Sequence, residues 1–268
     1  MATSYPEMES TRAFWNVNPC GMHGSYEDQK AQRYAMEPWL PGVLKYIAST
    51  QPNSILEIGC GQGIDSITLC TILSPGARYI GIDYSEKSIE SAAVNATSCS
   101  GKLAVRPSYR VGNAESLVFS DDEFEVVCSL GVIHHTHDEF KALFEVHRVL
   151  KPGGTAYIAL YRKPSLKVAV AQGLRAFQKA IDLLLGTDRC IYALVSRMGT
   201  SSKNFGTMFH ECFGVPYLKW YNRMEIEKLF SAFSSVSLKV YGPNFGRIAR
   251  GGDREIAQGY YWFITAVK

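Results

Sequence analysis

From residue 54 onward, short apolar runs alternate with segments in which apolar residues recur every three or four positions. Short apolar runs are typical of buried strands, and the longer period is typical of amphipathic helices. Strands that alternate with helices form right-handed crossovers and a parallel sheet. The pattern predicts strands at 54–58, 79–83, 109–111, 124–130 and 155–161, and helices at 64–73, 85–95 and 138–150.

The N-terminal part of the chain does not follow this rhythm. Residues 1–28 are polar and aromatic, and we expect them to form an irregular arm. Residues 29–49 have helical spacing, which Pro38 and Pro41 interrupt. Since proline ends or kinks a helix, two helices are predicted there.

A second departure covers residues 164–220. It contains a long, mostly apolar helical stretch at 166–185 and a segment at 199–217 rich in Gly, Ser, Phe and His, which we expect to be an ordered loop. We expect the whole insertion to cap the C-terminal edge of the sheet. Packing of its apolar helix in a dimer interface is the alternative that the sequence leaves open.

The βα rhythm returns at the end of the chain, with a helix at 223–233 and strands at 236–241 and 259–267. The predicted organisation is an N-terminal arm or lid (1–50), a ligand-binding core (51–163), a cap insertion (164–220) and a C-terminal completion of the core sheet (221–268).

Composition narrows the class of protein. The chain has 268 residues, of which 46% are hydrophobic and 20% charged, enough for one elaborated domain. A net charge of +3 is too small to indicate a nucleic-acid or anionic-membrane partner. The seven cysteines are scattered without a C-x-x-C pair, which disfavours disulfides and structural zinc. With no secretory signal and no run of 18 apolar residues, we expect a cytoplasmic protein.

A glycine-rich loop follows the first predicted strand and opens a helix, with the sequence Glu57-Ile-Gly59-Cys60-Gly61-Gln-Gly63. Glycines let the backbone turn sharply and approach a ligand, and the following helix presents free N–H groups to it. By itself the loop is a weak indication, because a dinucleotide site or an ordinary turn also uses glycines.

Asp83 ends the next predicted strand and makes the loop more informative. A carboxylate at that position can accept hydrogen bonds from both hydroxyls of a ribose; the alternative is an Asp that caps the following helix. The spacing G-x-G-x-G differs from the dinucleotide pattern G-x-G-x-x-G. The acidic Glu57 beside the loop would repel a pyrophosphate, whereas it suits a ligand with an ammonium and a sulfonium.

These residues and four later motifs resemble class I S-adenosylmethionine-dependent methyltransferases. Residues 56–63 resemble the first family motif, and Gly81-Ile-Asp83-Tyr-Ser85 resembles the second. Three more segments occur in the order and spacing of the family: Gly112–Glu115, Phe124–Asp138 and Leu150-Lys-Pro-Gly-Gly154. The resemblance implies an α/β fold, a doubly wound, mostly parallel sheet of seven strands with the last strand antiparallel.

The resemblance also implies S-adenosylmethionine as cofactor and roles for individual residues. In the loop that starts at Glu57, Gly59, Cys60, Gly61 and Gly63 would lie under the methionine part, and Asp65 would lie near its amino group. Asp83 would hold the ribose, Tyr84 would lie against the adenine, and Leu130 would contribute backbone contacts near the sulfonium. Asn113, Ala114 and Glu115 would hold the adenine edge, with Asn113 standing where the family usually has Asp. An amide oxygen still accepts from the adenine amino group, so that binding should survive in weakened form.

Methyl transfer from a sulfonium needs orientation of the acceptor, exclusion of water and, for some acceptors, removal of a proton. His134 and His135 follow the fourth predicted strand, at the edge of the sheet where ligands bind in open α/β folds. A neutral imidazole there can accept a proton near pH 7, and His135 is the better placed of the two. The alternative is that both histidines only shape the pocket.

Further candidates lie in the cap and in the arm. His210 and Glu211 lie in an aromatic loop and could orient a base or an acceptor, unless the two neighbours point in opposite directions. Tyr161, at the end of the fifth strand, could position an acceptor. In the arm, Tyr34 could face the methyl group, unless its helix only packs against the core. The other expected lid residues of the arm are Trp15, Asn18, Cys20, Gly21 and Arg33, and Arg33 could contact the carboxylate of the cofactor. In the cap, the aromatic neighbours of His210 are Phe205, Phe209, Phe213 and Tyr217.

Together these residues predict methyl transfer at O, N or C of a small, hydrophobic or heteroaromatic metabolite of secondary metabolism. The alternatives within the family are a C-methyltransferase of isoprenoid diphosphates and an RNA or protein methyltransferase. A diphosphate needs cations, which Arg162, Lys163, Lys167, Lys203 and Arg223 can supply, although acidic metal ligands are not evident and no metal is expected. The G-x-G-x-G spacing of the loop disfavours a nicotinamide-dependent reductase. The presence of Gly59, Gly61 and Asp83 disfavours a catalytically inactive binding subunit. The expected partners are the acceptor and, through the cap, a second copy of the chain, without nucleic acid or membrane.

Overall fold

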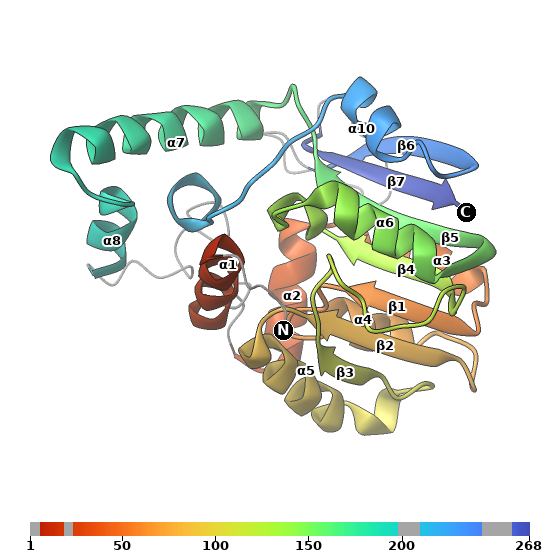
Figure 1. Ribbon diagram of the computed structural model, residues 1–268. Coiled ribbons are helices and arrows are strands. Elements are labelled where there is room, and N and C mark those ends of the chain that lie inside the picture. The colour runs from red at the N-terminus through yellow and green to blue at the C-terminus, as the bar shows by residue number, and fades with distance from the viewer. Residues whose placement is uncertain (1–5, 19–23, 198–209, 243–258) are drawn as a thin grey trace.

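The computed structural model describes residues 6–18, 24–197, 210–242 and 259–268. Its centre is a seven-stranded sheet with the order β3-β2-β1-β4-β5-β7-β6 (Figure 1). Neighbouring strands from β3 to β5 are parallel, whereas β7 runs antiparallel to both β5 and β6. The doubly wound α/β fold, with its antiparallel last strand, is therefore confirmed. The strands are β1 (Ser54–Ile58), β2 (Arg78–Asp83), β3 (Ser108–Val111), β4 (Phe124–Leu130), β5 (Leu150–Tyr161), β6 (Ser235–Tyr241) and β7 (Tyr261–Val267).

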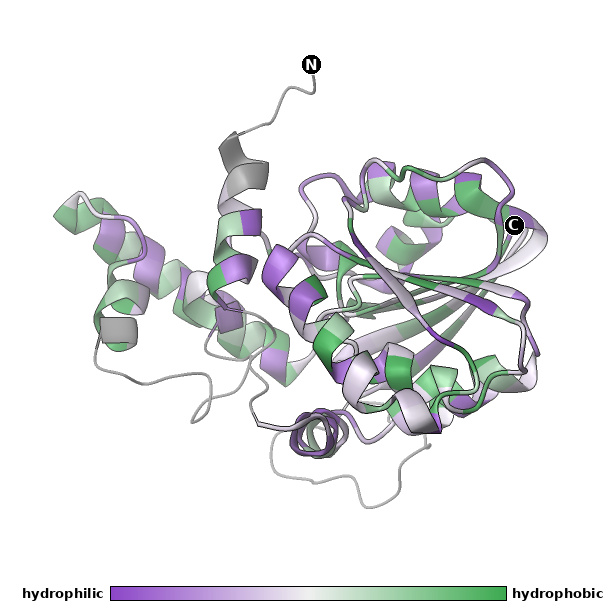
Figure 2. Ribbon diagram, turned by 90° about the horizontal axis from the view of Figure 1, so that it is seen from below, coloured by the Kyte–Doolittle hydropathy of each residue, from purple (hydrophilic) through white to green (hydrophobic). Residues whose placement is uncertain are grey.

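Helices cover both faces of the sheet (Figures 1 and 2). Side chains alternate along each strand, so that Leu56 and Ile58 face one hydrophobic cluster and Ile55 faces the other. The first cluster lies under α6 and α10, and the second under α3 and α4. The helices are α1 (Pro6–Val17), α2 (Tyr26–Met36), α3 (Leu40–Ser49), α4 (Ile64–Cys70), α5 (Glu86–Ser98), η1 (Ser100–Lys102), η2 (Ile133–His135), α6 (Glu139–Val149), α7 (Leu166–Leu185), α8 (Cys190–Arg197), η3 (His210–Gly214) and α10 (Arg223–Leu229).

Local sequence chemistry explains where several helices begin. The side chain of Ser85 accepts a hydrogen bond from Ser88 N at the start of α5, and Asp138 caps α6 in the same way. At α10 the cap is reciprocal, because Asn222 and Glu225 each bind the backbone N–H of the other. These caps satisfy N–H groups that a helix leaves without partners at its first turn.

The expectation of an irregular arm is wrong for the described part of residues 1–28. Pro6–Val17 forms α1, and α2 begins at Tyr26 behind a capping box of Ser25 and Asp28. Helix α1 is held by tertiary contacts: Arg12 and Asn16 both bind Glu86 at the start of α5. A periodicity search cannot detect such long-range contacts, which is why α1 was missed.

Two further boundaries differ from the prediction. Residues 151–154, predicted as a turn before the fifth strand, belong to β5, which pairs with β4 from Leu150 onward and shifts register between Phe124 and Val126. The cap contains the additional helix α8, and its predicted loop forms a π-helical turn at His210–Gly214. Phe205 and Phe209 of that loop, together with Lys203, Cys20 and Gly21, lie outside the described residues.

Helix α7 extends beyond the edge of the sheet at which the parallel strands end, and η3 lies between it and α1 (Figure 1). Leu183 and Leu184 at its far end are 85% and 83% exposed. The dimer interface expected for the cap stays a prediction. Across the described residues, no helix combines the length and the apolar character that crossing a membrane requires.

Candidate functional site

The glycine-rich turn after β1 lies between the end of β2 and the loop after β4. Gly59, Gly61 and Gly63 all have positive φ angles, of 79°, 52° and 82°. The amides of Gly59 and Cys60 donate to Ile82 O at 2.7 and 2.9 Å. A Cβ atom on Gly59 would lie 2.2 Å from Val132 Cγ2, so that only glycine fits there.

Asp83, at the end of β2, is oriented by two backbone amides. Its Oδ2 accepts from Gly61 N and its Oδ1 from Ser85 N, each at 2.9 Å. Burial raises the pKa of Asp83, and these backbone donors oppose that effect. Because a carboxylate oxygen accepts more than one hydrogen bond, both oxygens keep acceptor capacity for a ligand.

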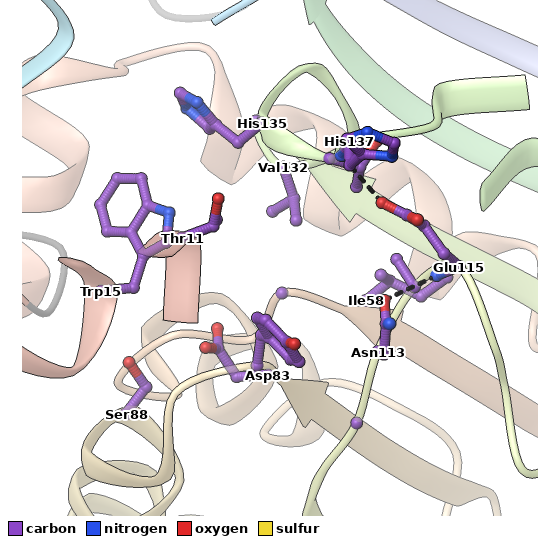
Figure 3. Close-up of a pocket in the computed structure, with 16 residues that line it drawn as sticks. Thr11, Trp15, Ile58, Asp83, Ser88, Asn113, Glu115, Val132, His135 and His137 are labelled. Carbon is purple, nitrogen blue, oxygen red and sulfur yellow. Dashed lines mark hydrogen bonds between the residues drawn. The ribbon is translucent and has the colours of Figure 1, made fainter. Parts of the chain in front are cut away.

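The segment after β3 forms a tight turn. Asn113 Oδ1 accepts from Glu115 N at 2.9 Å (Figure 3), which leaves this oxygen with one remaining lone pair. Glu115 Oε1 accepts from His137 N at 2.8 Å and Asp138 N at 3.1 Å. Glu115 therefore fixes the loop between η2 and α6 as well as lying at the edge predicted to hold adenine.

These elements surround a cavity at the C-terminal edge of the parallel strands (Figure 3). Seven of the predicted site residues line it, from four separate segments: Gly59, Asp83, Tyr84, Asn113, Ala114, Glu115 and His135. The other lining residues are Thr11, Trp15, Ile58, Ser88, Gly112, Gly131, Val132, Thr136 and His137. Among the residues predicted to bind cofactor, Glu57, Cys60, Gly61, Gly63, Asp65 and Leu130 do not line it.

Thr11 and Trp15 reach the cavity from α1, four residues apart on one helix face. Trp15 was expected as a lid residue, but Thr11 was not. The spacing of the two residues could have identified Thr11, since positions i and i+4 share a face of a helix. This inference requires a helix at residues 6–17, whereas the sequence predicts an irregular arm there.

Glu57 has surroundings that the sequence did not predict. It is buried and accepts a hydrogen bond from the Tyr79 hydroxyl at 2.9 Å. Burial, together with the nearby charge of Asp65, raises the pKa of Glu57 to about 8. Since Glu57 is then mainly neutral at pH 7, the argument that its charge repels a pyrophosphate is wrong.

Asp65 at the start of α4 forms a buried ion pair with Arg33 of α2. Arg33 Nη2 and Nε lie 2.8 and 3.2 Å from Asp65 Oδ2. The other oxygen, Oδ1, is buried and has no hydrogen-bond partner among the described residues. A buried acceptor without a partner costs free energy and is well suited to a ligand that brings an N–H donor.

Tyr34 does not reach the cavity. It packs against the cluster around Tyr26, Ile64 and Ile67 and against the larger cluster under α3 and α4. The side chain of Asn18 donates to Phe14 O and accepts from Tyr192 of the cap. Of the predicted lid residues that the structure describes, Trp15 alone lines the cavity.

His135 is the predicted catalytic residue that lines the cavity. Its Nδ1 lies 2.9 Å from the carbonyl oxygen of Tyr217 in the cap, and its ring packs edge-on against Trp15 at 5.3 Å. Burial lowers the pKa of His135, although the Tyr217 carbonyl and the charge of Glu211 oppose this effect. A carbonyl only accepts, so Nδ1 carries the proton and Nε2 keeps the basic lone pair.

His134 is fully buried and stacks on Tyr161 with the ring centroids 4.1 Å apart. Neither ring nitrogen has a hydrogen-bond partner among the described residues. Burial lowers the pKa of His134 far below its ordinary value, and the ring is therefore neutral. Neither His134 nor Tyr161 lines the cavity.

His210 and Glu211 point to different surroundings, which was the alternative to a joint role. His210 packs against Phe14 and Tyr192. Glu211 is buried, accepts from the Tyr161 hydroxyl and pairs with Lys167 at 3.1 Å. Burial raises the pKa of Glu211, but Lys167 and Tyr161 outweigh it and hold the pKa below its ordinary value.

The cations that a diphosphate would need are already engaged where the structure describes them. Lys163 pairs with Glu225 at 2.8 Å, and Arg223 lies 3.9 Å from Glu227. Arg162 donates to backbone carbonyls, and Lys167 pairs with Glu211. Nor do the described residues contain a group of three or more His, Cys, Asp or Glu side chains that could hold a metal.

Comparison with known proteins agrees with this geometry. Residues 56–158 match the family model described as a methyltransferase domain. The chain is 25% identical over 224 residues to a demethylmenaquinone methyltransferase of Staphylococcus carnosus, covering 82% of this chain and 85% of the relative. It is 27% identical over 173 residues to the 27-O-demethylrifamycin SV methyltransferase of Amycolatopsis mediterranei, covering 62% and 61%.

A solved S-adenosylmethionine-dependent methyltransferase from Aquifex aeolicus superposes with a TM-score of 0.54 over 88% of this chain and 92% of that chain, at 12% identity. This likeness supports the fold. The chain spans only about half the length of several other curated relatives that it matches. Residues 56–158 thus form a methyltransferase domain with the class I, Rossmann-like fold.

Proposed function

We propose, from the premise that residues 56–158 are a methyltransferase domain, that this chain transfers a methyl group from S-adenosylmethionine to a small hydrophobic or heteroaromatic metabolite. The observation that carries the proposal is the position of His135, a half-buried neutral imidazole that lines the same cavity as Asp83, Asn113 and Glu115. A proton acceptor and the predicted cofactor-binding residues therefore share one enclosed site.

The residues of the cavity, together with Asp65 outside its lining, fit the cofactor. Asp83 presents two oriented carboxylate oxygens that suit the two hydroxyls of a ribose, with Tyr84 beside it for the adenine ring. Gly59 lets the turn pass close to Val132, and both residues line the cavity. Asp65 Oδ1 has no partner among the described residues and suits an ammonium group.

The residues predicted to hold adenine can bind it, but Asn113 offers a weaker contact than the usual Asp. Since Asn113 Oδ1 already accepts from Glu115 N, one lone pair remains for the adenine amino group. The amide of Asn113 also lacks the negative charge of the Asp that the family usually has. We infer that Asn113 contributes less to adenine binding than an Asp would.

When bound, S-adenosylmethionine supplies a methyl group on a positively charged sulfur, so that attack by a lone pair of the acceptor breaks the methyl–sulfur bond and leaves a neutral thioether. The protein holds the acceptor in line with that bond and excludes water. His135 Nε2 takes the proton that an O–H or N–H acceptor loses, and the resulting imidazolium returns it to solvent. Trp15 of α1 encloses the acceptor beside His135.

The kind of acceptor follows from the surfaces that surround it. Trp15 and Val132 favour an apolar or aromatic body, and Lys163 and Lys167 are already paired with carboxylates. The names of two relatives, a demethylmenaquinone methyltransferase and a demethylrifamycin methyltransferase, also support a small metabolite.

The test is to incubate the protein with S-adenosylmethionine and a panel of hydroxylated aromatic metabolites and to measure formation of S-adenosylhomocysteine. The proposal predicts turnover with at least one phenolic or heteroaromatic acceptor, and its loss in His135→Gln. Turnover only with RNA, a protein or an isoprenoid diphosphate would contradict it.

A further inference from the structure

Next to His135 lies a buried ion pair that the methyl-transfer step does not use. Lys167 Nζ is 3.1 Å from Glu211 Oε2, and the two side chains are only 15% and 6% exposed. The hydroxyl of Tyr161 donates to the other oxygen of Glu211. The attraction between two buried charges repays the cost of removing them from water only when the geometry is good, so a buried ion pair is weak evidence for stability alone.

One short segment connects this ion pair to the imidazole of His135. Glu211 lies at the start of residues 210–217, and Tyr217 lies at their end, where its carbonyl oxygen accepts from His135 Nδ1 at 2.9 Å. The position of that carbonyl therefore depends on how residues 210–217 are attached to the rest of the protein.

The attachment has two parts. Along the backbone, Arg175 of α7 donates to the carbonyls of Glu211 and Val215 at 2.9 and 3.0 Å, and Gln178 donates to the carbonyl of Phe213 at 2.8 Å. These contacts join the segment to α7. The side chain of Glu211 joins it to β5, because Tyr161 is the last residue of that strand. Glu211 thus bonds the start of the segment to the sheet that carries the site. Beyond its end, Lys219 N donates to His134 O at 2.9 Å.

The charge of Glu211 also acts on His135. Glu211 opposes the effect of burial on the pKa of His135, whereas Lys167 and Arg175 of α7 lower that pKa further. From the other elements, Tyr161 of β5 and His134 pack near the ring with centroid distances of 6.4 and 4.3 Å. Burial holds the phenol of Tyr161 protonated and the ring of His134 neutral. Glu211 is therefore the anion in this group that favours a more basic imidazole.

We propose that Glu211 is a positioning residue for His135. By anchoring residues 210–217 to Tyr161 and Lys167, it holds the Tyr217 carbonyl on Nδ1 and keeps the lone pair on Nε2. This role rests on the proposed function, since it needs an acceptor whose O–H or N–H proton goes to His135. It also narrows the substrate class to acceptors with such a proton and excludes those methylated at a tertiary amine or a thioether.

The experiment compares wild-type protein with Glu211→Gln, Glu211→Ala and Glu211→Asp. In protein labelled with ¹⁵N at histidine, NMR reports the tautomer and the pKa of His135 without any methyl transfer. We expect wild-type His135 to carry its proton on Nδ1. In Glu211→Gln, which keeps an acceptor for Tyr161 but lacks the charge, the pKa of His135 should fall. In Glu211→Ala the Nδ1 proton should also become exchangeable, as the tautomers mix. In Glu211→Asp, which keeps the charge on a shorter side chain, the pKa of His135 should lie between its values in Glu211→Gln and in the wild type.

Kinetics supply the second readout. We expect kcat to fall about tenfold in Glu211→Gln and further in Glu211→Ala, with the KM for S-adenosylmethionine unchanged, because the loss affects proton transfer and not cofactor binding. The matched control is Glu227→Gln, which removes a carboxylate that is 58% exposed on α10 and should change neither readout.

The outcomes separate the two proposals. If Glu211→Ala leaves the tautomer and the pKa of His135 unchanged, the positioning role is wrong, whatever the activity. If the variants change the tautomer and the pKa of His135 as expected, but the wild-type protein methylates no acceptor with an O–H or N–H group, the proposed function is wrong. The structural coupling between Glu211 and His135 then still holds. If Glu211→Ala does not fold, Glu211→Gln and Glu211→Asp still decide, because both retain an acceptor for Tyr161.

Discussion

The carbonyl oxygen of Tyr217 lies 2.9 Å from Nδ1 of His135, and this contact joins the cap to the loop after β4. Because the carbonyl can only accept, it determines which nitrogen of the imidazole carries the proton. The cap therefore sets the chemical form of the side chain that we propose as the base.

Replacement of His135 by Gln should lower kcat by about 10²-fold or more, which is the usual contribution of a general base. The affinity for S-adenosylhomocysteine should stay within about twofold of the wild type, because the predicted cofactor contacts lie elsewhere in the cavity. Steady-state kinetics and calorimetry measure the two quantities. A parallel loss of binding would mean that His135 shapes the pocket instead.

The pH dependence follows from the same residue. Burial lowers the pKa of His135 from its ordinary value of 6.5. The neutral ring is the active form, so kcat should fall only when the pH drops through this lowered pKa and should be flat above it. Activity should thus persist to a more acidic pH than an exposed histidine would allow. His135→Gln should abolish this limb, and an unchanged limb in that variant would assign it to another group.

Gly59→Ala should destabilise the fold and weaken cofactor binding. Its φ of +79° is strained for Ala, and the new Cβ would meet Val132 at 2.2 Å. Gly76→Ala is a matched control, since Gly76 has a φ of +95° but nothing within 4 Å of the added Cβ. We expect about 1–2 kcal/mol from the left-handed backbone in both variants, and roughly 1–3 kcal/mol more at Gly59 from the clash. Urea unfolding measures both losses, and equal losses would show that the turn after β1 does not press against the loop after β4.

Glu57→Gln should stabilise the protein more at high pH than at low pH. Burial raises the pKa of Glu57 to about 8 in the folded state, against 4.5 for an ordinary Glu. Between these values the folded state binds more protons than the unfolded state, so the contribution of Glu57 to stability is present below pH 4.5 and is lost as the pH rises to about 8. Gln keeps an acceptor for Tyr79 and has no proton to lose.

The difference in the free energy of unfolding between Glu57→Gln and wild type should therefore grow by up to a few kcal/mol between pH 5 and pH 9, at about 1.4 kcal/mol for each unit of pKa shift. Chemical denaturation at a series of pH values measures it, with the exposed Glu227→Gln as control. A difference that is constant with pH would show that Glu57 is ionised in the folded protein.

Glu86 should control how firmly α1 closes the cavity. Arg12 and Asn16 of α1 both bind Glu86, and the same helix brings Thr11 and Trp15 to the cavity. Because Arg12 and Glu86 are 33% and 44% exposed, the contact is screened by solvent, and Glu86→Ala should weaken S-adenosylhomocysteine binding only about two- to fivefold. High salt should produce the same weakening in the wild type and none in the variant. Quenching of Trp15 on binding, with Trp15→Phe as reference, follows the closure.

The sequence predicted those strands and helix starts that depend on neighbouring residues in the chain. The first and fourth strands have the predicted bounds, 54–58 and 124–130, because each is a continuous apolar run between turn residues. Ser85 and Asp138 cap α5 and α6 as short polar residues before amphipathic segments should. The resemblance, which rests on five motifs including the glycine-rich turn and Asp83, extended this to a doubly wound sheet of seven strands with the last strand antiparallel.

The sequence could not supply relationships between distant segments. Helix α1 depends on Glu86, about 70 positions away from its partners. Whether Glu57 is charged depends on its burial and on Tyr79 and Asp65, and the sequence predicted the wrong state. The pairing of Glu211 with Lys167 and Tyr161 required α7 and β5 to meet at η3, which no periodicity encodes.

The central claim is that Asp83 and the glycine-rich turn form a site for S-adenosylmethionine, and calorimetric titration with S-adenosylhomocysteine tests it most directly. Wild-type protein should bind the product with an affinity well below millimolar, and Asp83→Ala, which removes the carboxylate held by Gly61 and Ser85, should weaken binding at least about tenfold. Glu227→Gln should bind as the wild type does. No binding by the wild type below about millimolar, or unchanged affinity in Asp83→Ala, would contradict the account.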